Sequence, residues 1–449
     1  MNIKNQPRTT MKKLIIIMLA LLSFQGYAQQ STTDVKVSLQ EAIDLGLKNR
    51  YDVQADKYDL AIADNEIGES KKEWIPEISG SGNVRYSPQI QSTYIPAGYF
   101  GNEAGLVALG AKSSSVFGLD LNQTIFKPGI NSDIKIAKNN LEIEKERNRQ
   151  SENTIKEQIA YAYLSVVLRE LQSTIAAADE QRYQEYEQVA EGKMKAGSLL
   201  ENDYLKAKLD YENAKVETQK AKQNYQLALD NIKYQMNVPG ETQLVLSDSL
   251  DAAGFLLDQL PTANDVVNRT EIEQLILQQE SNKLQVNKSR QNALPSLSLY
   301  ANYSKQYLNT NFDYSLKQWW SPYSYVGLRL SVPITYNLKN HHNIQSNQFK
   351  SIQTNLELKQ KEADINYEVH KAAFELDNAS KNMNTAKNNY DLSRVIYENQ
   401  KQQYDLGSLL YSDLLDTDRS LNHTEQNYVK SVYDYLVAII NYQKALGNY

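Results

Sequence analysis

The amino-acid sequence repeats one plan in its two halves. Each half contains, in the same order, an Asn-Arg dipeptide, a proline that precedes an alternating segment, and a Gly-Ser-Leu-Leu motif followed by an aspartate. The matching segments are 49–53 with 268–272, 74–79 with 293–298, and 196–200 with 406–410. Three landmarks in the same order indicate a duplicated structural unit. We assign residues 29–240 to the first repeat, 241–261 to a link and 262–449 to the second repeat.

Each repeat contains a very long tract that is predicted to be helical. All ten prolines of the chain lie outside residues 129–238 and 334–449, and glycine is nearly absent from both tracts. Proline and glycine are the residues that interrupt helices, so their absence predicts long, continuous helices. We therefore predict two helical hairpins, over 130–238 and 336–446.

Two glycines are the expected reversal points of these hairpins. Gly197 and Gly407 would each end one helix in the left-handed conformation, and Ser198 and Ser408 would be the N-caps of the helices that follow. Apolar residues recur along the arms at intervals of three and four, which predicts a narrow coiled-coil seam between otherwise polar helices. The seam residues are Ile155, Ile159, Ala162 and Val166 in the first hairpin, and Val429, Val432, Leu436 and Ile439 in the second.

Between the helical tracts, residues 77–125 and 296–334 alternate between apolar and polar side chains. Period-two segments of about 10–12 residues suit tilted strands with one apolar and one polar face, and two strands are predicted in each region. Aromatic residues in the connecting loops are typical of a membrane interface. They are Tyr94, Tyr99, Phe100, Trp319, Trp320 and Tyr323. The alternation alone is also compatible with an ordinary antiparallel sheet packed on a helix, an alternative that the export signal, the paired placement and the aromatic flanks make less favourable.

The N-terminus predicts export. Two lysines, an apolar run over 14–22 and a small-residue site ending at Ala28 are typical of a secretory signal peptide over 1–28. The apolar run is too short to cross a bilayer as a helix. Translation would start at Met1 or at Met11, because the ten residues before Met11 add no recognisable signal.

Composition excludes several classes of protein. The absence of cysteine excludes a disulfide framework, a thiolate metal site and a lipidated N-terminal cysteine. Removal of the signal peptide removes four basic side chains and no acidic one, so 48 against 54 becomes 44 against 54, a net charge of −10. That balance argues against nucleic acid as a partner. A hydrophobic fraction of 41% favours an elongated molecule with much surface.

Four strands per chain cannot close a membrane barrel, because about eight is the working minimum. An open sheet edge in hydrocarbon would leave backbone groups unpaired, at a cost of several kcal/mol each. If the strands span a membrane, the barrel must therefore combine several copies in a cyclic homo-oligomer. Two copies would give eight strands and three would give twelve. The helical arms would then continue the barrel as a ring on one side of the membrane.

Several short motifs give the chain a family resemblance. They are Ser38–Ile43 followed by Asn49, Pro76 and Pro295 at helix-to-strand junctions, Val332–Ile334, the Gly197 to Asp203 and Gly407 to Asp413 turns, and Ala445–Gly447. In this duplicated order they resemble the outer membrane efflux (TolC-like) proteins along essentially all of the mature chain. The resemblance implies a mainly α-helical fold with a transmembrane β region, assembled as a homotrimer. Its twelve-stranded β-barrel would continue into a long α-helical barrel, with residues 241–261 in a mixed equatorial region.

The resemblance also implies a function and partners. It implies an outer membrane exit duct with a long periplasmic extension, serving a tripartite efflux pump or type I secretion. The partners would be a periplasmic adaptor, an inner-membrane transporter contacted indirectly or at the tip, and outer membrane lipid. Cargo selection would belong to the inner-membrane partner, so drug, metal, siderophore and polypeptide export all stay open.

The sharpest candidate site follows the second reversal. Asp413 and Asp416 are three residues apart, so a helix places both on one face, and a trimer would gather six carboxylates around one opening, attractive to cations. Both positions resemble the family's constricting acidic residues, and Tyr404 resembles its gate tyrosine. The alternative is that Asp413 only favours the positive end of a helix dipole. The family's arginine two residues after the glycine is Leu409 here, and Lys206 occupies the first-repeat position equivalent to Asp416.

The two reversals are also the expected docking surface for the helical hairpin of an adaptor. The residues concerned are Gly197, Ser198, Asp203, Gly407 and Ser408. A competing hypothesis is a soluble periplasmic coiled-coil adaptor or scaffold whose short sheets pack on its own helices. An enzyme is disfavoured, since no convergent acid, base or nucleophile set is visible, and no cofactor is expected. Adjacent His341 and His342 do not point two imidazoles at one metal ion.

Overall fold

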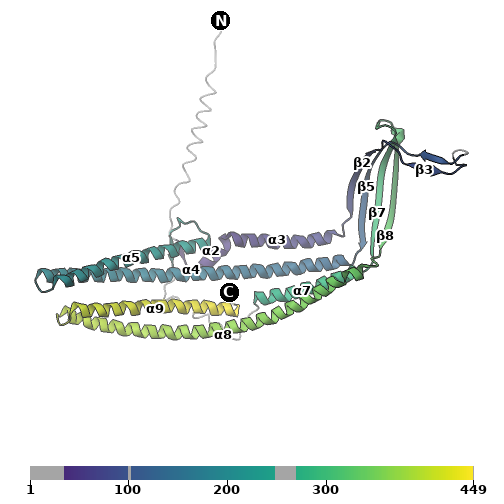
Figure 1. The fold of residues 1–449 in the computed structure, drawn as a ribbon. Coiled ribbons are helices and arrows are strands. Elements are labelled where there is room, and N and C mark those ends of the chain that lie inside the picture. Colours follow the sequence, from purple (N-terminus) through teal and green to yellow (C-terminus); the bar gives the residue numbers. More distant parts are fainter. Residues whose placement is uncertain (1–34, 100–102, 248–268, 448–449) are drawn as a thin grey trace, which may run out of the picture. The chain divides into compact units, whose positions relative to one another are not determined.

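The computed structural model describes three segments of the chain, residues 35–99, 103–247 and 269–447 (Figure 1). Three predicted features lie outside these residues: the signal peptide over 1–28 with both candidate start methionines, the aromatic residue Phe100, and most of the link, 248–261. Among the helices of the described segments, none combines the length and the apolar character that a membrane crossing requires.

The described chain forms two compact units. The first unit contains residues 35–51, 152–247 and 370–447, and the second contains 52–99, 103–151 and 269–369. Two very long helices contribute to both units, α4 (Gly129–Lys195) and α8 (Tyr336–Asp405). Because neither contains proline, and Gly192 is the only glycine in α4 after its first residue, both helices run without a break for 67 and 70 residues.

Each long helix is followed by a shorter partner that returns beside it, α5 (Glu201–Met236) after α4 and α9 (Tyr411–Leu446) after α8 (Figure 1). In the first unit, the predicted apolar seam packs α4 against α9. Ala160 and Leu164 of α4 pack with Leu436, Ile439 and Ile440 of α9, all buried. The two hairpins therefore contact each other through a narrow apolar stripe, while most of their other side chains are polar.

Both helix reversals are Schellman motifs. Gly197 and Gly407 each have φ of 76°, the left-handed conformation that glycine adopts without a Cβ clash. The amide of Ser198 donates to the carbonyl of Lys193, and the amide of Ser408 repeats this bond in the second hairpin. The prediction that the two serines are N-caps is wrong. Each serine instead completes the C-terminus of the preceding helix, because its hydroxyl also donates to the helix carbonyl five residues back.

The N-caps of the returning helices are Leu200 and Leu410, and neither has a side-chain cap hydrogen bond. Their positions are decided by the short turn, which leaves only three residues after each glycine before the next helix begins. Acidic side chains compensate in the first turns, where Asp203 and Asp413 interact favourably with the positive end of the helix dipole.

The described residues also contain a small parallel strand pair and three shorter α-helices. β1 (Val35–Val37) pairs in parallel with β6 (Leu244–Leu246). The helices are α2 (Leu39–Asn49), α3 (Tyr51–Lys72) and α7 (Thr270–Gln291). Ser38 begins α2 with a reciprocal capping box to Glu41. Gly46 lies so close to the long helices that an added Cβ would be 2.2 Å from Ile159 Cδ1.

The second unit contains a four-stranded antiparallel sheet with strand order β2-β5-β7-β8. The strands are β2 (Glu77–Tyr86), β5 (Ser113–Phe126), β7 (Ser296–Asn309) and β8 (Trp320–Ser331). Each repeat contributes two neighbouring strands, and β5 pairs with β7 where the repeats meet. The outer strands β2 and β8 each have one edge without a partner among the described residues.

The second of the two strands predicted within residues 296–334 ends earlier than expected. It was expected to end at Ile334, but β8 ends at Ser331 because Pro333 has no amide to donate to the ladder. β8 begins at Trp320. Trp320 and Tyr323 therefore belong to the strand and not to a connecting loop. A further hairpin was missed, in which β3 (Ser92–Ile95) pairs with β4 (Gly105–Ala108). A single helical turn, η2 (Lys317–Trp319), precedes β8.

The element order repeats. α3-β2-β5-α4-α5 is followed by α7-β7-β8-α8-α9, and the short β3–β4 hairpin is inserted in the first repeat. This order confirms the predicted fold class, a mainly α-helical chain built from a duplicated helix, strand, strand, helix, helix unit.

The reversal glycines allow a matched test of backbone strain. We expect Gly407→Ala to lower the free energy of unfolding by about 1 kcal/mol, because alanine disfavours the left-handed conformation. No atom lies within 4 Å of the added Cβ, so the backbone alone decides the effect. The matched variant is Gly192→Ala, inside α4, where an added Cβ also meets no atom within 4 Å. This substitution should raise the free energy of unfolding by roughly 0.5–1 kcal/mol. Thermal unfolding followed by circular dichroism should give shifts of opposite sign; shifts of the same sign would contradict this account.

Candidate functional site

The two aspartates predicted after the second reversal lie on the surface of α9. Asp413 and Asp416 are both exposed, whereas Leu414 and Leu415 between them are buried. The side chain of Asp416 is 79% exposed and lies 3.8 Å from Arg419, an ion pair of i,i+3 spacing. At that exposure the pair is weak, so the carboxylates present negative charge to the solvent.

Arg419 also connects the two returning helices. Its Nη2 lies 3.3 Å from Asp210 Oδ1 on α5, in addition to its contact with Asp416. At the first reversal, Asp203 pairs with Lys206 at 3.3 Å. The first hairpin thus places a cation where the second places Asp416, and the two tips differ in charge as the sequence indicates.

A groove between α5 and α9 joins the two tips within the first unit. Its volume is 410 Å³. Its lining mixes leucines with charged side chains. The residues that matter here are Asp203, Lys206, Asp210, Asp416 and Arg419. The predicted tip residues Asp203 and Asp416 therefore share one concave surface.

Tyr404 is not part of this exposed surface. Its ring is buried between the two hairpins, where it packs against Tyr411 at a centroid distance of 6.2 Å. The ammonium of Lys193 lies 4.1 Å above the ring, a cation–π contact from α4 to α8. The structure thus separates Tyr404 from the carboxylates of Asp413 and Asp416, and places it in the packing between the hairpins of one chain.

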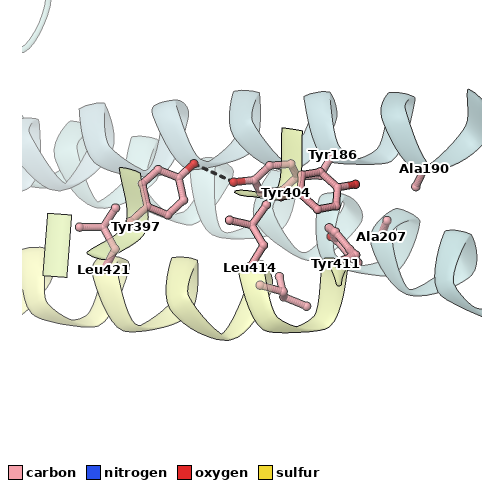
Figure 2. Packing of buried hydrophobic residues seen from close by; sticks show 9 residues of the cluster. Tyr186, Ala190, Ala207, Tyr397, Tyr404, Tyr411, Leu414 and Leu421 are labelled. Carbon is pink, nitrogen blue, oxygen red and sulfur yellow. Dashed lines mark hydrogen bonds between the residues drawn. The ribbon is translucent and has the colours of Figure 1, made fainter. Parts of the chain in front are cut away.

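Tyr404 belongs to an aromatic cluster that sequence reasoning missed (Figure 2). Tyr186 of α4 and Tyr397 of α8 share a hydrogen bond of 2.7 Å between their hydroxyls. Burial, and then that hydrogen bond, raise the pKa of Tyr186 far above its ordinary value. A signal was present in the sequence, because three tyrosines of α8 occur at seven-residue spacing, the period of a coiled-coil seam. They are Tyr390, Tyr397 and Tyr404.

A charged network next to this cluster was also missed. Arg182 of α4 bonds Asp418 of α9 at 3.1 Å and forms an ion pair with Asp179 one turn earlier. The side chain of Asp418 is completely buried. Burial raises the pKa of Asp179 to about 6, and the charge of Asp418 acts in the same direction against the opposing effect of Arg182. Sequence alone gave no signal, since α4 and α9 carry many charged residues and only the fold brings these together.

The sheet of the second unit has two chemically different faces. One face carries large apolar side chains that are more than half exposed: Ile78, Leu119, Val326, Leu328 and Leu330. On the other face Asp120 accepts hydrogen bonds from Asn302 at 2.8 Å and from Ser81 at 3.2 Å. The register aligns the apolar residues across the strands, with Leu299 opposite Leu328 and Ala301 opposite Val326. The apolar side chains thus form a continuous band across the sheet.

The aromatic residues predicted at a membrane interface are distributed unequally. Trp320 packs on Tyr307 at 5.4 Å and on Phe117 at 6.2 Å, at one end of the sheet. Its neighbour Trp319 is 44% exposed, and Tyr99, near the β3–β4 hairpin, is 78% exposed. Tyr307 is the buried centre of this group, a role that the sequence did not reveal.

Within the described residues, no group of three or more histidine, cysteine or acidic side chains is arranged to hold a metal ion. The rings of His341 and His342 lie edge to face with centroids 5.7 Å apart.

Comparison with known proteins places this geometry in a family. The model of the outer membrane efflux protein family matches residues 42–236 and 266–448. No curated protein matches the chain in sequence. The fold is shared with the CmeC outer membrane channel of Campylobacter jejuni, at a TM-score of 0.72 and 17% identity, covering 91% of this chain and 85% of CmeC.

Two further solved structures show the same fold. The outer membrane protein VceC of Vibrio cholerae gives a TM-score of 0.69 at 13% identity, covering 91% of this chain and 96% of VceC. The MtrE outer membrane channel of Neisseria gonorrhoeae, in its open state, gives 0.70 at 15% identity, covering 91% of this chain and 88% of MtrE. The family model spans well over half of the sequence, and the chain therefore belongs to the outer membrane efflux protein family.

Proposed function

We propose that this protein is the outer membrane exit duct of a tripartite efflux or type I secretion system. It receives substrates from an inner-membrane transporter and a periplasmic adaptor and passes them to the cell exterior. Family membership supports the assignment as an outer membrane efflux channel. The observation that carries the proposal is the open four-stranded sheet, whose exposed apolar band suits contact with lipid.

The sheet also supports assembly as a homotrimer. Four strands leave β2 and β8 with unpaired edges among the described residues, and such edges are costly in hydrocarbon. Three copies close a ring of twelve strands, in which β8 of one copy pairs with β2 of the next. The helical hairpins then form the periplasmic part of the duct, with the Gly197 and Gly407 reversals as its tip.

A soluble adaptor or scaffold is the alternative function. In that case the apolar band of the sheet would face water, and its exposure would cost about 25 cal/mol for each Å². Leu119 and Val326, which are 57% and 73% exposed, would both contribute to that cost. The band therefore favours the membrane channel.

Substitutions on the two faces of the sheet test the membrane assignment. Leu119→Arg on the apolar face should cost about 2–4 kcal/mol near the middle of the bilayer and reduce the folded outer membrane fraction. Ser79→Arg on the polar face, opposite Asp120, should be tolerated. The measurement is the carbonate-resistant, heat-modifiable protein recovered from outer membranes. A wild-type protein extracted by carbonate would refute the proposal, and so would equal tolerance of both substitutions.

The proposed gate consists of Asp413 and Asp416, whose six carboxylates in a trimer surround the tip opening. Their exposure, away from the buried leucines of α9, supports this role. Tyr404 acts differently in this proposal. Its ring packs in the aromatic cluster and contacts Lys193, which holds α8 against α4. Tyr404 would therefore affect gating by restraining the α8–α9 hairpin, which carries the two aspartates.

Conductance in planar bilayers tests the gate. Asp413→Ala combined with Asp416→Ala should reduce cation selectivity and weaken block by multivalent cations at least about tenfold, equivalent to ~1.4 kcal/mol of binding free energy. The control is Asp377→Ala, an exposed aspartate of α8 paired with Lys381, which should change neither property. An unchanged selectivity and block in the double variant would eliminate the two aspartates as the gate.

Site-specific photo-cross-linking tests docking at the tip. A photoreactive amino acid at the exposed positions Ser198 or Ser408 should form adducts with a periplasmic adaptor, identified by peptides of its helical hairpin. The same probe at Glu241, an exposed residue beside β6, serves as the comparison. Adducts obtained at Glu241 but at neither serine would place the adaptor at the equator instead of the tip.

A further inference from the structure

Arg182 connects the two helical hairpins through charge. It lies on α4, where it pairs with Asp179 of the same helix, and its Nε donates to Asp418 Oδ1 of α9 at 3.1 Å. The exposed fractions of these side chains are 23% for Arg182, 9% for Asp179 and 0% for Asp418. The carboxylate side of this ion pair between the hairpins is therefore withdrawn from water, while Arg182 keeps partial access to solvent.

The network contains more negative than positive charge. Two carboxylates share one guanidinium, and the completely buried Asp418 also interacts with the hydroxyl of Tyr183 on α4. Asn422 of α9 donates a hydrogen bond to Asp179 Oδ2. A buried negative charge without its own cation is costly, so the packed arrangement of the hairpins gains if one carboxylate is protonated.

We propose that Asp179, Arg182 and Asp418 form a proton-sensitive catch between the two helical hairpins, which holds them together more tightly at mildly acidic than at neutral pH. Protonation of Asp179 leaves Arg182 fully available to Asp418. Loss of that proton restores the excess negative charge and weakens the contact between α4 and α9. The catch goes beyond the exit-duct function; only its effect on flow through the duct rests on that function.

The direction of the pH effect follows from how tightly Asp179 binds a proton in the packed and in the separated hairpins. In the packed state the pKa of Asp179 is about 6, against 3.8 for an ordinary aspartate. Between these values the packed hairpins bind more protons than separated hairpins do. Their packing is therefore strengthened as pH falls through about 6, and this gain is lost as pH rises above it.

Other charged groups surround the catch from every packed helix. Glu425 of α9 adds negative charge and raises the pKa of Asp179 further. The ring of Tyr397 on α8 lies 5.9 Å from the guanidinium carbon of Arg182. A groove of 640 Å³ beside Asp179 is lined by further titratable side chains, which are Tyr183 of α4, Asp210, Glu217 and Lys220 of α5, and Arg419 and His423 of α9. His423 lines the same groove, so a His423 variant serves as a control.

Hydrogen exchange of the full-length protein in detergent micelles tests the catch directly. After correction for intrinsic rates, amides of residues 414–425 in the wild type should be protected about tenfold more at about pH 5 than at about pH 7.5, the ratio expected for the two pKa values above. Asp179→Asn imitates the protonated carboxyl. It should remove the pH dependence and give protection at about pH 7.5 at least as strong as that of the wild type at about pH 5.

Two variants separate the catch from other sources of pH dependence. His423→Gln removes the nearby histidine, and Asp377→Asn removes an exposed aspartate of α8 whose side chain is 55% exposed. Both should keep the tenfold response. The proposal is overturned if the wild type shows no difference between the two pH values, if Asp179→Asn keeps the full response, or if His423→Gln abolishes it. Exchange reports the packing of the hairpins, so this result stands apart from whether the protein conducts.

Discussion

Backbone hydrogen bonding at the edges of the sheet constrains the rest of this molecule. Strands β2 and β8 end a sheet of only four strands, and their outer amides and carbonyls have no partners among the described residues. Water can satisfy such groups but hydrocarbon cannot. An apolar band across the same sheet, with Leu328 and Leu330 about two-thirds exposed, favours hydrocarbon. The two demands are compatible only when another copy supplies the missing partners.

The helical hairpins are held together partly by polar contacts. They contact each other through a narrow seam in which tyrosine hydroxyls and buried charges replace much of the usual aliphatic core, as in the Tyr186–Tyr397 bond and the Arg182–Asp418 pair. Polar contacts in a seam depend strongly on geometry and protonation, whereas apolar contacts do not. Such a seam suits helices that must stay together under one condition and separate under another.

The fold class could be predicted from the sequence because its signals are long and repeated. Proline-free tracts indicated α4 and α8, and period-two alternation indicated the sheet, since both patterns extend over many residues. Short features were harder. Ser198 and Ser408 were expected to begin helices but end them, because the Schellman bond to a carbonyl five residues back leaves no trace in composition. The Arg182 network unites residues 236 positions apart, a proximity that only the folded chain supplies.

The even number of strands in the sheet determines how two copies can join. Because the four strands alternate in direction from β2 to β8, the two outermost strands run in opposite senses. When β8 meets β2 of an adjacent copy, that seam is antiparallel like every internal one, whatever the number of copies. A unit with three or five strands would force a mismatched parallel junction at each boundary. Two strands from each repeat therefore keep every junction of a closed ring antiparallel, whatever the number of copies.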